Sequence, residues 1–162
     1  MSDLVIRPLA VADIEAVIAL ERQCFPTVWY AGAYRSELEN PASLYLTAWR
    51  GPALAGFAGA AVIEDEVHIL TIAVDPACRR QGIGRRLLVE LLEQAHRRGA
   101  RRATLEVREG NQAARALYER YGFQPVAYIN HYYVDTGENA VVMWLNPLLA
   151  GLSAFHHPAE HA

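Results

Sequence analysis

The longest regular pattern in the chain is a run of apolar residues at helical spacing that begins at Ile83. Positions 83, 87, 88, 91, 92 and 95 are apolar, whereas arginine and glutamate occupy the opposite face. Gly99 then stands where a helix commonly ends, because glycine tolerates the left-handed C′ position. The pattern predicts an amphipathic helix that covers one face of a sheet.

Shorter patterns precede this helix. Strands have alternating or continuous apolar residues bounded by turn residues, and helices have apolar residues three and four apart. The second helix ends before Pro41, because proline disfavours helical geometry in the residue before it. The expected elements are a strand at Leu4–Arg7, helices at Asp13–Arg22 and Tyr30–Glu39, and strands at Leu44–Trp49, Ala53–Ile63 and Val67–Val74. A turn at Glu64–Glu66 makes the last three strands an antiparallel meander.

Four further elements follow the long helix. They are a strand at Ala103–Val107, a helix at Asn111–Tyr121 closed by Gly122, and strands at Phe123–Val134 and Ala140–Leu145. The order β-α-α-β-β-β-α-β-α-β-β predicts an α+β fold with one strand-helix-strand crossover. We expect one domain over residues 1–146 and a flexible tail over 147–162.

Composition agrees with one compact globular domain. The 162 residues are 52% hydrophobic and 20% charged, which is enough to form a core without a metal or disulfide. The two cysteines, Cys24 and Cys78, are distant in sequence and form no metal-binding pair. Free thiols in a reducing compartment are the expectation.

Charge and hydropathy limit the function classes. All 15 basic residues are arginine, and the net charge is −3, which argues against a nucleic-acid-binding role. The first ten residues lack the positive cluster and apolar run of an export signal. The apolar stretch Pro52–Ile63 is too short for a bilayer of about 30 Å. We therefore expect a cytoplasmic protein with no membrane and no nucleic-acid partner.

Candidate chemistry lies between a strand end at Ile72–Pro76 and the long helix. The loop Arg79–Arg85 contains Gly82 and Gly84 at the start of the helix, where backbone N–H groups and the helix dipole favour a phosphate. A Walker loop requires lysine, which this chain lacks, and a Rossmann fingerprint requires a third glycine where Leu87 stands. The alternative is that the glycines only shape a turn.

The loop resembles the Q/R-x-x-G-x-G/A signature of the GNAT family of N-acetyltransferases. Within that family the chain is similar to bacterial enzymes that acetylate the N-terminal alanine of a ribosomal protein, and the resemblance covers about Leu4 to Leu145. The fold implied is a mixed sheet of about seven strands with helices on both faces. The matching stretches are Ile72–Pro76, Arg79–Gly84, Leu105–Arg108, Asn111 with Ala113–Ala114, Ala116–Glu119, Gly122–Phe123 and Tyr132–Tyr133.

The resemblance implies acetyl-coenzyme A as co-substrate and assigns residues to it. The backbone of Ile72, Ala73 and Val74 would pair with the pantetheine arm. Asn111 would contact coenzyme A near the start of its helix, although a plain N-cap role is compatible with its position. The amides expected around the pyrophosphate are those of Arg80, Gln81, Gly82, Ile83, Gly84 and Arg85.

Acetyl transfer to an amine requires a base and a proton for the departing thiolate. Glu106 matches the family's catalytic glutamate and suits the base, because an α-ammonium must lose a proton before it attacks. Tyr118 matches the general acid, because a phenol keeps its proton at neutral pH. The alternatives are an ordinary strand-end carboxylate and a core aromatic. With no nucleophile motif present, we expect direct attack of the amine on the thioester.

The acceptor is less constrained. Tyr132 and Tyr133 are the preferred candidates for contacting a peptide, and Trp29, Tyr30 and Tyr34 are further candidates that suit core packing equally well. The leading hypothesis is acetylation of a protein N-terminus, such as that of a ribosomal protein. Acetylation of a lysine or small amine, and a non-catalytic acyl-coenzyme A-binding module, are the alternatives. The histidines are scattered, so no metal site is expected.

Overall fold

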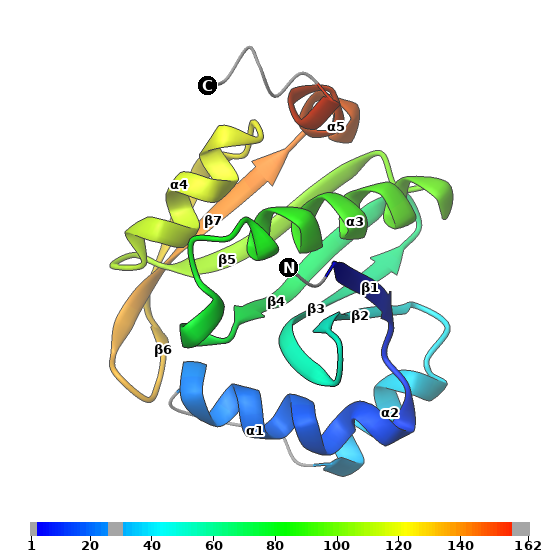
Figure 1. Cartoon of the computed structure of the whole chain (residues 1–162). Helices are drawn as coiled ribbons and strands as arrows, with labels where there is room; N and C mark the ends of the chain where they lie inside the picture. Colours follow the sequence, from blue (N-terminus) through cyan, green and yellow to red (C-terminus); the bar gives the residue numbers. More distant parts are fainter. Residues whose placement is uncertain (1–2, 26–30, 157–162) are drawn as a thin grey trace. The chain divides into compact units, whose positions relative to one another are not determined.

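The computed structural model describes residues 3–25 and 31–156 of the chain. Trp29 and Tyr30, two of the candidates for contacting an acceptor peptide, lie outside this part. The elements in order are β1 (Leu4–Pro8), the 3-10 helix η1 (Val11–Asp13), α1 (Ile14–Cys24), α2 (Ala31–Glu39), β2 (Ser43–Arg50), β3 (Ala53–Ile63), β4 (Glu66–Val74), the 3-10 helix η2 (Pro76–Cys78), α3 (Ile83–Arg97), β5 (Arg102–Arg108), α4 (Gln112–Arg120), β6 (Gln124–Tyr133), β7 (Glu138–Leu145) and α5 (Leu148–His156) (Figure 1).

The strands form one seven-stranded mixed sheet in the order β1-β2-β3-β4-β5-β7-β6. β1, β2 and β3 pair antiparallel in sequence order, and β7 pairs antiparallel with both β5 and β6. β4 and β5 are parallel and are joined through α3, which is the predicted strand-helix-strand crossover. The α+β fold with a mixed seven-stranded sheet is confirmed.

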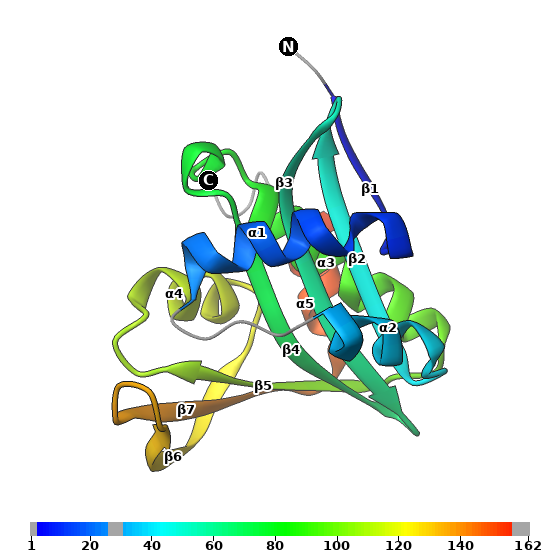
Figure 2. The same cartoon turned by 90° about the horizontal axis from the view of Figure 1, so that it is seen from below.

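The chain divides into two compact units, Met1–Ala61 with Thr71–Leu91 and Val62–Leu70 with Leu92–Ala162. In the first unit α1 lies across β2 and β3 (Figure 2). Its apolar face contributes Ile14 and Val17 to a core that also contains Tyr45 and Phe57. Successive strand residues point to opposite faces, so Gly56, next to Phe57, faces Ile83 and Leu87 of α3. Helices therefore cover both faces of this part of the sheet, as expected.

For Tyr34 the sequence leaves acceptor contact and core packing as equal alternatives, and the structure favours core packing. Its side chain is 2% exposed and belongs to the core of the first unit. Its ring makes edge contacts with Tyr45 and Phe57 at centroid distances of 6.1 and 6.5 Å. Edge-to-face pairs of this kind stabilise a core, so Tyr34 is a packing residue.

The second unit contains a helix that the sequence analysis did not predict. α5 packs against β7 (Figure 1), and Leu148 and Leu152, one helical turn apart, are buried. A Cβ at Gly151 would lie 2.7 Å from Leu145 Cδ2 and 3.0 Å from the Tyr121 carbonyl, so glycine permits this close approach. The segment predicted as a tail thus contains a helix up to residue 156, and residues 157–162 lie outside the described part.

Candidate active site

The end of β4 and the loop after it are held in place by local hydrogen bonds. The Asp75 amide donates to the Ala55 carbonyl on β3 at 2.8 Å. The Asp75 carboxylate accepts from the Ala77 amide at 2.9 Å and so caps η2. These bonds fix the direction in which the chain leaves Val74 and enters the loop.

The loop before α3 adopts a conformation that exposes backbone donors. Arg80 has φ +66° and Gly82 has φ +77°, both in the left-handed region. Alternating left- and right-handed residues turn successive N–H groups toward one point, where they form an anion-binding concavity. The first four N–H groups of an α-helix also lack intrahelical acceptors. The backbone from Gln81 to Arg85 thus has the donors that a phosphate requires.

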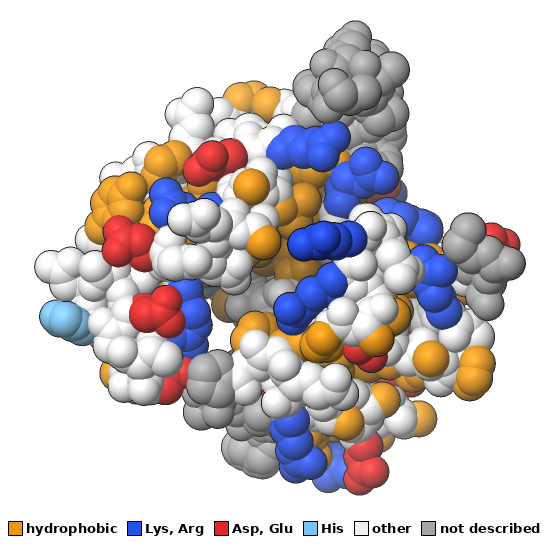
Figure 3. Space-filling view, turned by 60° about the vertical axis from the view of Figure 1, so that its left-hand side comes forward, with side chains coloured by type: hydrophobic (Ala, Val, Ile, Leu, Met, Phe, Trp, Pro, Cys, Tyr) orange, Lys and Arg blue, Asp and Glu red, His pale blue; other side chains and the backbone are white. Residues whose placement is uncertain are grey.

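The Arg85 side chain lies over this loop. Its Nη2 atom would be 3.6 Å from a Cβ at Gly82, so the guanidinium lies against the glycine backbone. Its Nε is buried and has no hydrogen-bond partner among the described residues. Buried donors are normally satisfied, so an anion at the loop is a fitting acceptor. Several arginine side chains also appear on the face of the molecule drawn in Figure 3.

Cys24 and Arg79 contact one another at the end of α1. The Cys24 thiol donates to the Val74 carbonyl at 3.5 Å, and Arg79 Nη2 lies 4.0 Å from Sγ. Burial raises the pKa of the Cys24 thiol, and the charge and hydrogen bond of Arg79 oppose this only in part. A protonated thiol is not a nucleophile, so Cys24 gives no support to a covalent mechanism.

Glu106 lies on β5, in the second unit, one residue after its parallel pairing with β4 ends at Leu105. Its side chain is 20% exposed. His68 Nε2 lies 2.9 and 3.1 Å from the two carboxylate oxygens. The Tyr132 hydroxyl donates to Oε1 over a long distance of 3.5 Å. The carboxylate is therefore accessible and is flanked by two further titratable groups.

The contact of His68 with Glu106 is not predicted from the sequence. In the β4–β5 register His68 is opposite Thr104, and Glu106 lies two residues further on the same face. Aligning β4 and β5 in parallel, with His68 opposite Thr104, would have predicted that His68 and Glu106 are neighbours. The hydrogen bond to the Glu106 carboxylate is the main reason that the pKa of His68 is raised; burial opposes the rise, and the charges of Glu106 and Glu66 add to it.

Tyr118 is buried in the second unit. It is 8% exposed, and its ring contacts Phe123 at a centroid distance of 5.7 Å. Burial raises the pKa of Tyr118 well above its usual value, and the neighbouring Tyr133 adds to the rise. The phenol therefore carries its proton at neutral pH. The packing agrees with the core-aromatic alternative, and the role of Tyr118 as the acid stays a prediction.

The predicted acceptor residues Tyr132 and Tyr133 lie side by side at the end of β6. Their rings are 5.0 Å apart and nearly perpendicular. Tyr132 is 45% exposed, whereas Tyr133 is half-buried and lies 4.1 Å from the Arg108 guanidinium in a cation–π contact. Burial raises the pKa of Tyr133 to about 12, although the charge of Arg108 opposes this.

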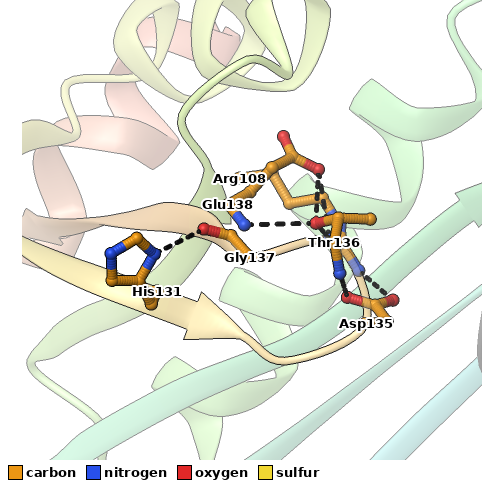
Figure 4. A network of polar contacts seen from close by, with 6 residues as sticks. All are labelled: Arg108, His131, Asp135, Thr136, Gly137 and Glu138. Atoms are coloured by element: carbon orange, nitrogen blue, oxygen red, sulfur yellow. Dashed lines mark hydrogen bonds and ion pairs between the residues drawn. The ribbon is translucent and has the colours of Figure 1, made fainter.

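Arg108 organises the hairpin that carries the tyrosines (Figure 4). It donates to the Asp135 carboxylate at 3.0 and 3.2 Å, to Thr136 Oγ1 at 3.0 Å and to Glu138 at 3.2 Å. These charge-assisted bonds tie β5 to the turn between β6 and β7.

The β6 strand bulges between Ile129 and Tyr133. Ile129 pairs with Ala140 and Tyr133 with Glu138, so three residues of β6 lie between these pairs against one residue of β7. His131 has φ +53° within the bulge, and its ring nitrogen contacts the Gly137 carbonyl at 3.0 Å (Figure 4). Bulges redirect side chains. Tyr132 lies within this irregular segment, and its hydroxyl reaches Glu106 on β5.

Asn111 caps α4. Its side-chain oxygen accepts from the Ala114 amide at 3.2 Å, which is the plain N-cap role considered in the sequence analysis. Contact of Asn111 with coenzyme A remains a prediction.

The structure thus groups the predicted residues in two sets. Glu106, Tyr118, Tyr132 and Tyr133 lie in the second unit with Asn111, whereas Ile72–Val74 and Arg80–Arg85 lie in the first.

Within residues 3–25 and 31–156, no three His, Cys, Asp or Glu side chains cluster so as to hold a metal ion. Among the same residues, no helix combines the length and apolar character needed to cross a membrane.

Comparison with known proteins assigns the chain to a family. Residues 14–123 match the model of the acetyltransferase (GNAT) family. The chain is 43% identical over 140 residues to the N-alpha-acetyltransferase RimI of Mycobacterium tuberculosis, covering 82% of this chain and 85% of that protein. It is 36% identical over 143 residues to the [ribosomal protein bS18]-alanine N-acetyltransferase of Escherichia coli, covering 86% and 95%. The crystal structure of the ribosomal-protein-S18-alanine N-acetyltransferase from Escherichia coli superposes with a TM-score of 0.81 at 33% identity over 90% of this chain and 94% of that one. The chain belongs to the GNAT family of acetyltransferases.

Proposed function

We propose that this protein transfers the acetyl group of acetyl-coenzyme A to the N-terminal α-amine of a protein, with an alanine-starting ribosomal protein as the leading acceptor. The observation that carries the proposal is the similarity over more than four-fifths of the chain to proteins named as N-terminal acetyltransferases. The arrangement of residues in each unit supports it.

Acetyl-coenzyme A is assigned to the first unit through the backbone. The pairing of β4 with β5 ends at Ile69, and the backbone of Ile72–Val74 beyond it suits the amide-containing pantetheine arm, because strand backbone offers both donors and acceptors. The N–H groups from Arg80 to Arg85 suit the pyrophosphate, and the unpartnered Arg85 Nε adds a charged donor at the same loop. The thioester supplies the electrophilic acyl carbon, and Asn111 is retained as a further candidate contact with coenzyme A.

Glu106 is the proposed base. An α-ammonium has a pKa near 8, so most acceptor N-termini carry an extra proton at neutral pH. A carboxylate within hydrogen-bond reach stabilises the ammonium on arrival and then removes its proton, directly or through water. The partly exposed side chain, with Tyr132 at its rim, suits contact with a terminal amine.

Tyr118 is the proposed proton donor to the departing sulfur. Its raised pKa makes it a weak acid, so full proton transfer to a thiolate in water would be unfavourable. The same burial that raises the pKa of the phenol would also raise that of a thiol leaving beside it. The hydroxyl therefore donates a hydrogen bond first and passes its proton as negative charge develops on sulfur.

The acceptor is tested by mass spectrometry. The protein is incubated with acetyl-coenzyme A and a panel of alanine-starting peptides, lysine peptides with blocked N-termini and small amines, and the acetylated atom is located by fragmentation. Acetyl on the α-amine alone supports the proposal. Acetyl only on lysine or a small amine refutes the proposed acceptor, and cofactor binding without turnover indicates an acyl-coenzyme A-binding module.

The base is tested with Glu106→Gln, which keeps the size of the side chain and removes its basicity. We expect kcat to fall by roughly 10²- to 10⁴-fold while the Kd for acetyl-coenzyme A stays near the wild-type value. Glu109→Gln is the matched control, because Glu109 is an exposed carboxylate just after the same strand. Equal losses in the two variants, or loss of acetyl-coenzyme A binding with Glu106→Gln, would count against Glu106 as the base.

A further inference from the structure

The contact between His68 and Glu106 is unusually direct for two side chains from different strands. One ring nitrogen, Nε2, faces both oxygens of the carboxylate at 2.9 and 3.1 Å. The Nδ1 atom on the opposite edge of the ring is therefore free of this contact. The His68 side chain is 38% exposed, almost twice the exposed fraction of Glu106, so the ring is more open to water than the carboxylate is.

The titratable groups around the ring come from three strands. Glu66 lies on β4 with His68, Glu106 lies on β5, and the Tyr132 hydroxyl on β6 donates to Glu106 Oε1. The two glutamates favour the imidazolium form, while the neutral phenol of Tyr132 adds no charge. A proton that reaches Nε2 is thus stabilised where it arrives.

We propose that His68 relays the acceptor's proton from Glu106 to solvent. The proposal rests on the proposed function, because it requires an ammonium substrate. An N–H bond of the ammonium breaks as its proton forms an O–H bond with Glu106. That proton then moves from the Glu106 oxygen to Nε2 of the neutral ring, which restores the carboxylate and forms the imidazolium. The imidazolium releases the proton on Nδ1 to water, and the ring returns to the neutral state with Nε2–H.

The next turnover requires the other neutral tautomer, with Nε2 free to accept. Exchange of ring protons with water supplies it, because the ring is partly exposed. His68 acts through Glu106 and is therefore a positioning and relay residue rather than a group that touches the substrate. Rapid recovery of the carboxylate matters because a protonated Glu106 cannot bind or deprotonate the next ammonium.

The first test measures the ionisation of His68 without any turnover. A pH titration of the ring C–H signals by NMR gives the pKa of His68 in the wild-type protein and in Glu106→Gln. The relay predicts a pKa above about 6.5 in the wild type and a fall in the variant, because the carboxylate holds the proton on the ring. A pKa that does not respond to Glu106→Gln would overturn the relay.

The second test uses His68→Gln, which keeps an N–H donor for the carboxylate but cannot take up a proton. With the amine that the wild-type protein acetylates, kcat should fall roughly tenfold, less than for loss of the base itself. Taking the ratio of wild-type to variant kcat removes the pH dependence that comes from ionisation of the acceptor amine, because that dependence is the same for both proteins. This ratio should rise with pH through the His68 pKa measured by NMR, because only the neutral ring accepts a proton.

The control and the outcomes separate the relay from the proposed function. His96→Gln replaces an exposed histidine in the last turn of α3 and should leave kcat unchanged at every pH. An active wild type with a pH-independent ratio, or with full activity in His68→Gln, would overturn the relay alone. No turnover on any amine would refute the proposed function, and the relay with it.

Discussion

Substitution of Gly82 by valine tests the assignment of the loop before α3 most sharply. A Cβ at this position would meet nothing closer than Arg85 Nη2 at 3.6 Å, so the new side chain has room within the protein. The conflict lies in the backbone, because Gly82 has φ +77°. A β-branched residue is a clear outlier in that region.

The expected magnitude follows from two steps. Holding an L-residue in the left-handed region costs about 1–2 kcal/mol, which sets the expected loss of stability if the loop keeps its shape. The valine side chain then obstructs the pyrophosphate at the loop and weakens its binding. If the loop instead relaxes, its N–H groups turn away from the pyrophosphate. Loss of one hydrogen bond to a charged group costs about 1.5–3 kcal/mol, which corresponds to an acetyl-coenzyme A affinity roughly ten- to hundredfold weaker.

Calorimetric titration with acetyl-coenzyme A and urea unfolding measure the two effects separately. Gly99→Val is the matched control, because Gly99 has φ +101° at the other end of the same helix and its Cβ would meet nothing within 4 Å. This control should lose stability but keep its affinity for acetyl-coenzyme A. Wild-type affinity in Gly82→Val, or an equal loss in Gly99→Val, would refute the loop as the pyrophosphate site.

Three other predictions follow from particular contacts. Tyr118→Phe keeps the packing against Phe123 but removes the hydroxyl, so kcat should fall about 10²-fold or more with little change in KM for acetyl-coenzyme A. Tyr121→Phe, at another buried tyrosine, is the control. Equal kcat values in the two variants would exclude Tyr118 as the acid. Gly59→Ala would place a Cβ 2.7 Å from Tyr45 Cζ and should destabilise the protein by about 1–3 kcal/mol in urea unfolding, while Gly110→Ala, with only a 3.4 Å contact, should stay within about 0.5 kcal/mol. Because the folded-state pKa of His68 is raised, its contact with Glu106 contributes stability below the unfolded pKa of about 6.5 and loses it as the pH rises through the folded value. The free energies of unfolding of the wild type and His68→Gln should therefore differ more at about pH 5.5 than at about pH 9. An equal difference at the two pH values would contradict the pairing of His68 with Glu106.

Elements with a long local pattern were predictable from the sequence. α3 begins at Ile83, where the helical spacing of apolar residues begins, and Gly99 beyond its end has φ +101°. The β3 limits Ala53–Ile63 agree with the apolar run and the acidic turn that follows it. These features depend on residues close in sequence, so propensity and periodicity are sufficient to locate them.

α5 was not predictable in the same way. Its nine residues contain Gly151 and directly follow Pro147, and both residue types favour a loop when no tertiary contact is known. The helix is stabilised by burial of Leu148 and Leu152 within the second unit. Gly151, which weakens the local helix signal, permits the close contact with Leu145. Tertiary packing therefore outweighs the local preference.

At the candidate site, the residue types were predictable from the sequence, whereas their neighbours in space were not. Glu106 and Tyr118 were identified as residue types at positions that match a family signature, and this required no knowledge of their neighbours. The pairing of Glu106 with His68 depends on the register of two parallel strands 38 residues apart, and the approach of Tyr132 depends on a bulge in a third. Neither has a local sequence signal, yet both determine which groups lie within hydrogen-bond distance of the carboxylate. A residue's identity thus indicates what reaction it can support, whereas the strand register determines which groups lie beside it, and for this protein only the folded structure supplies the second point.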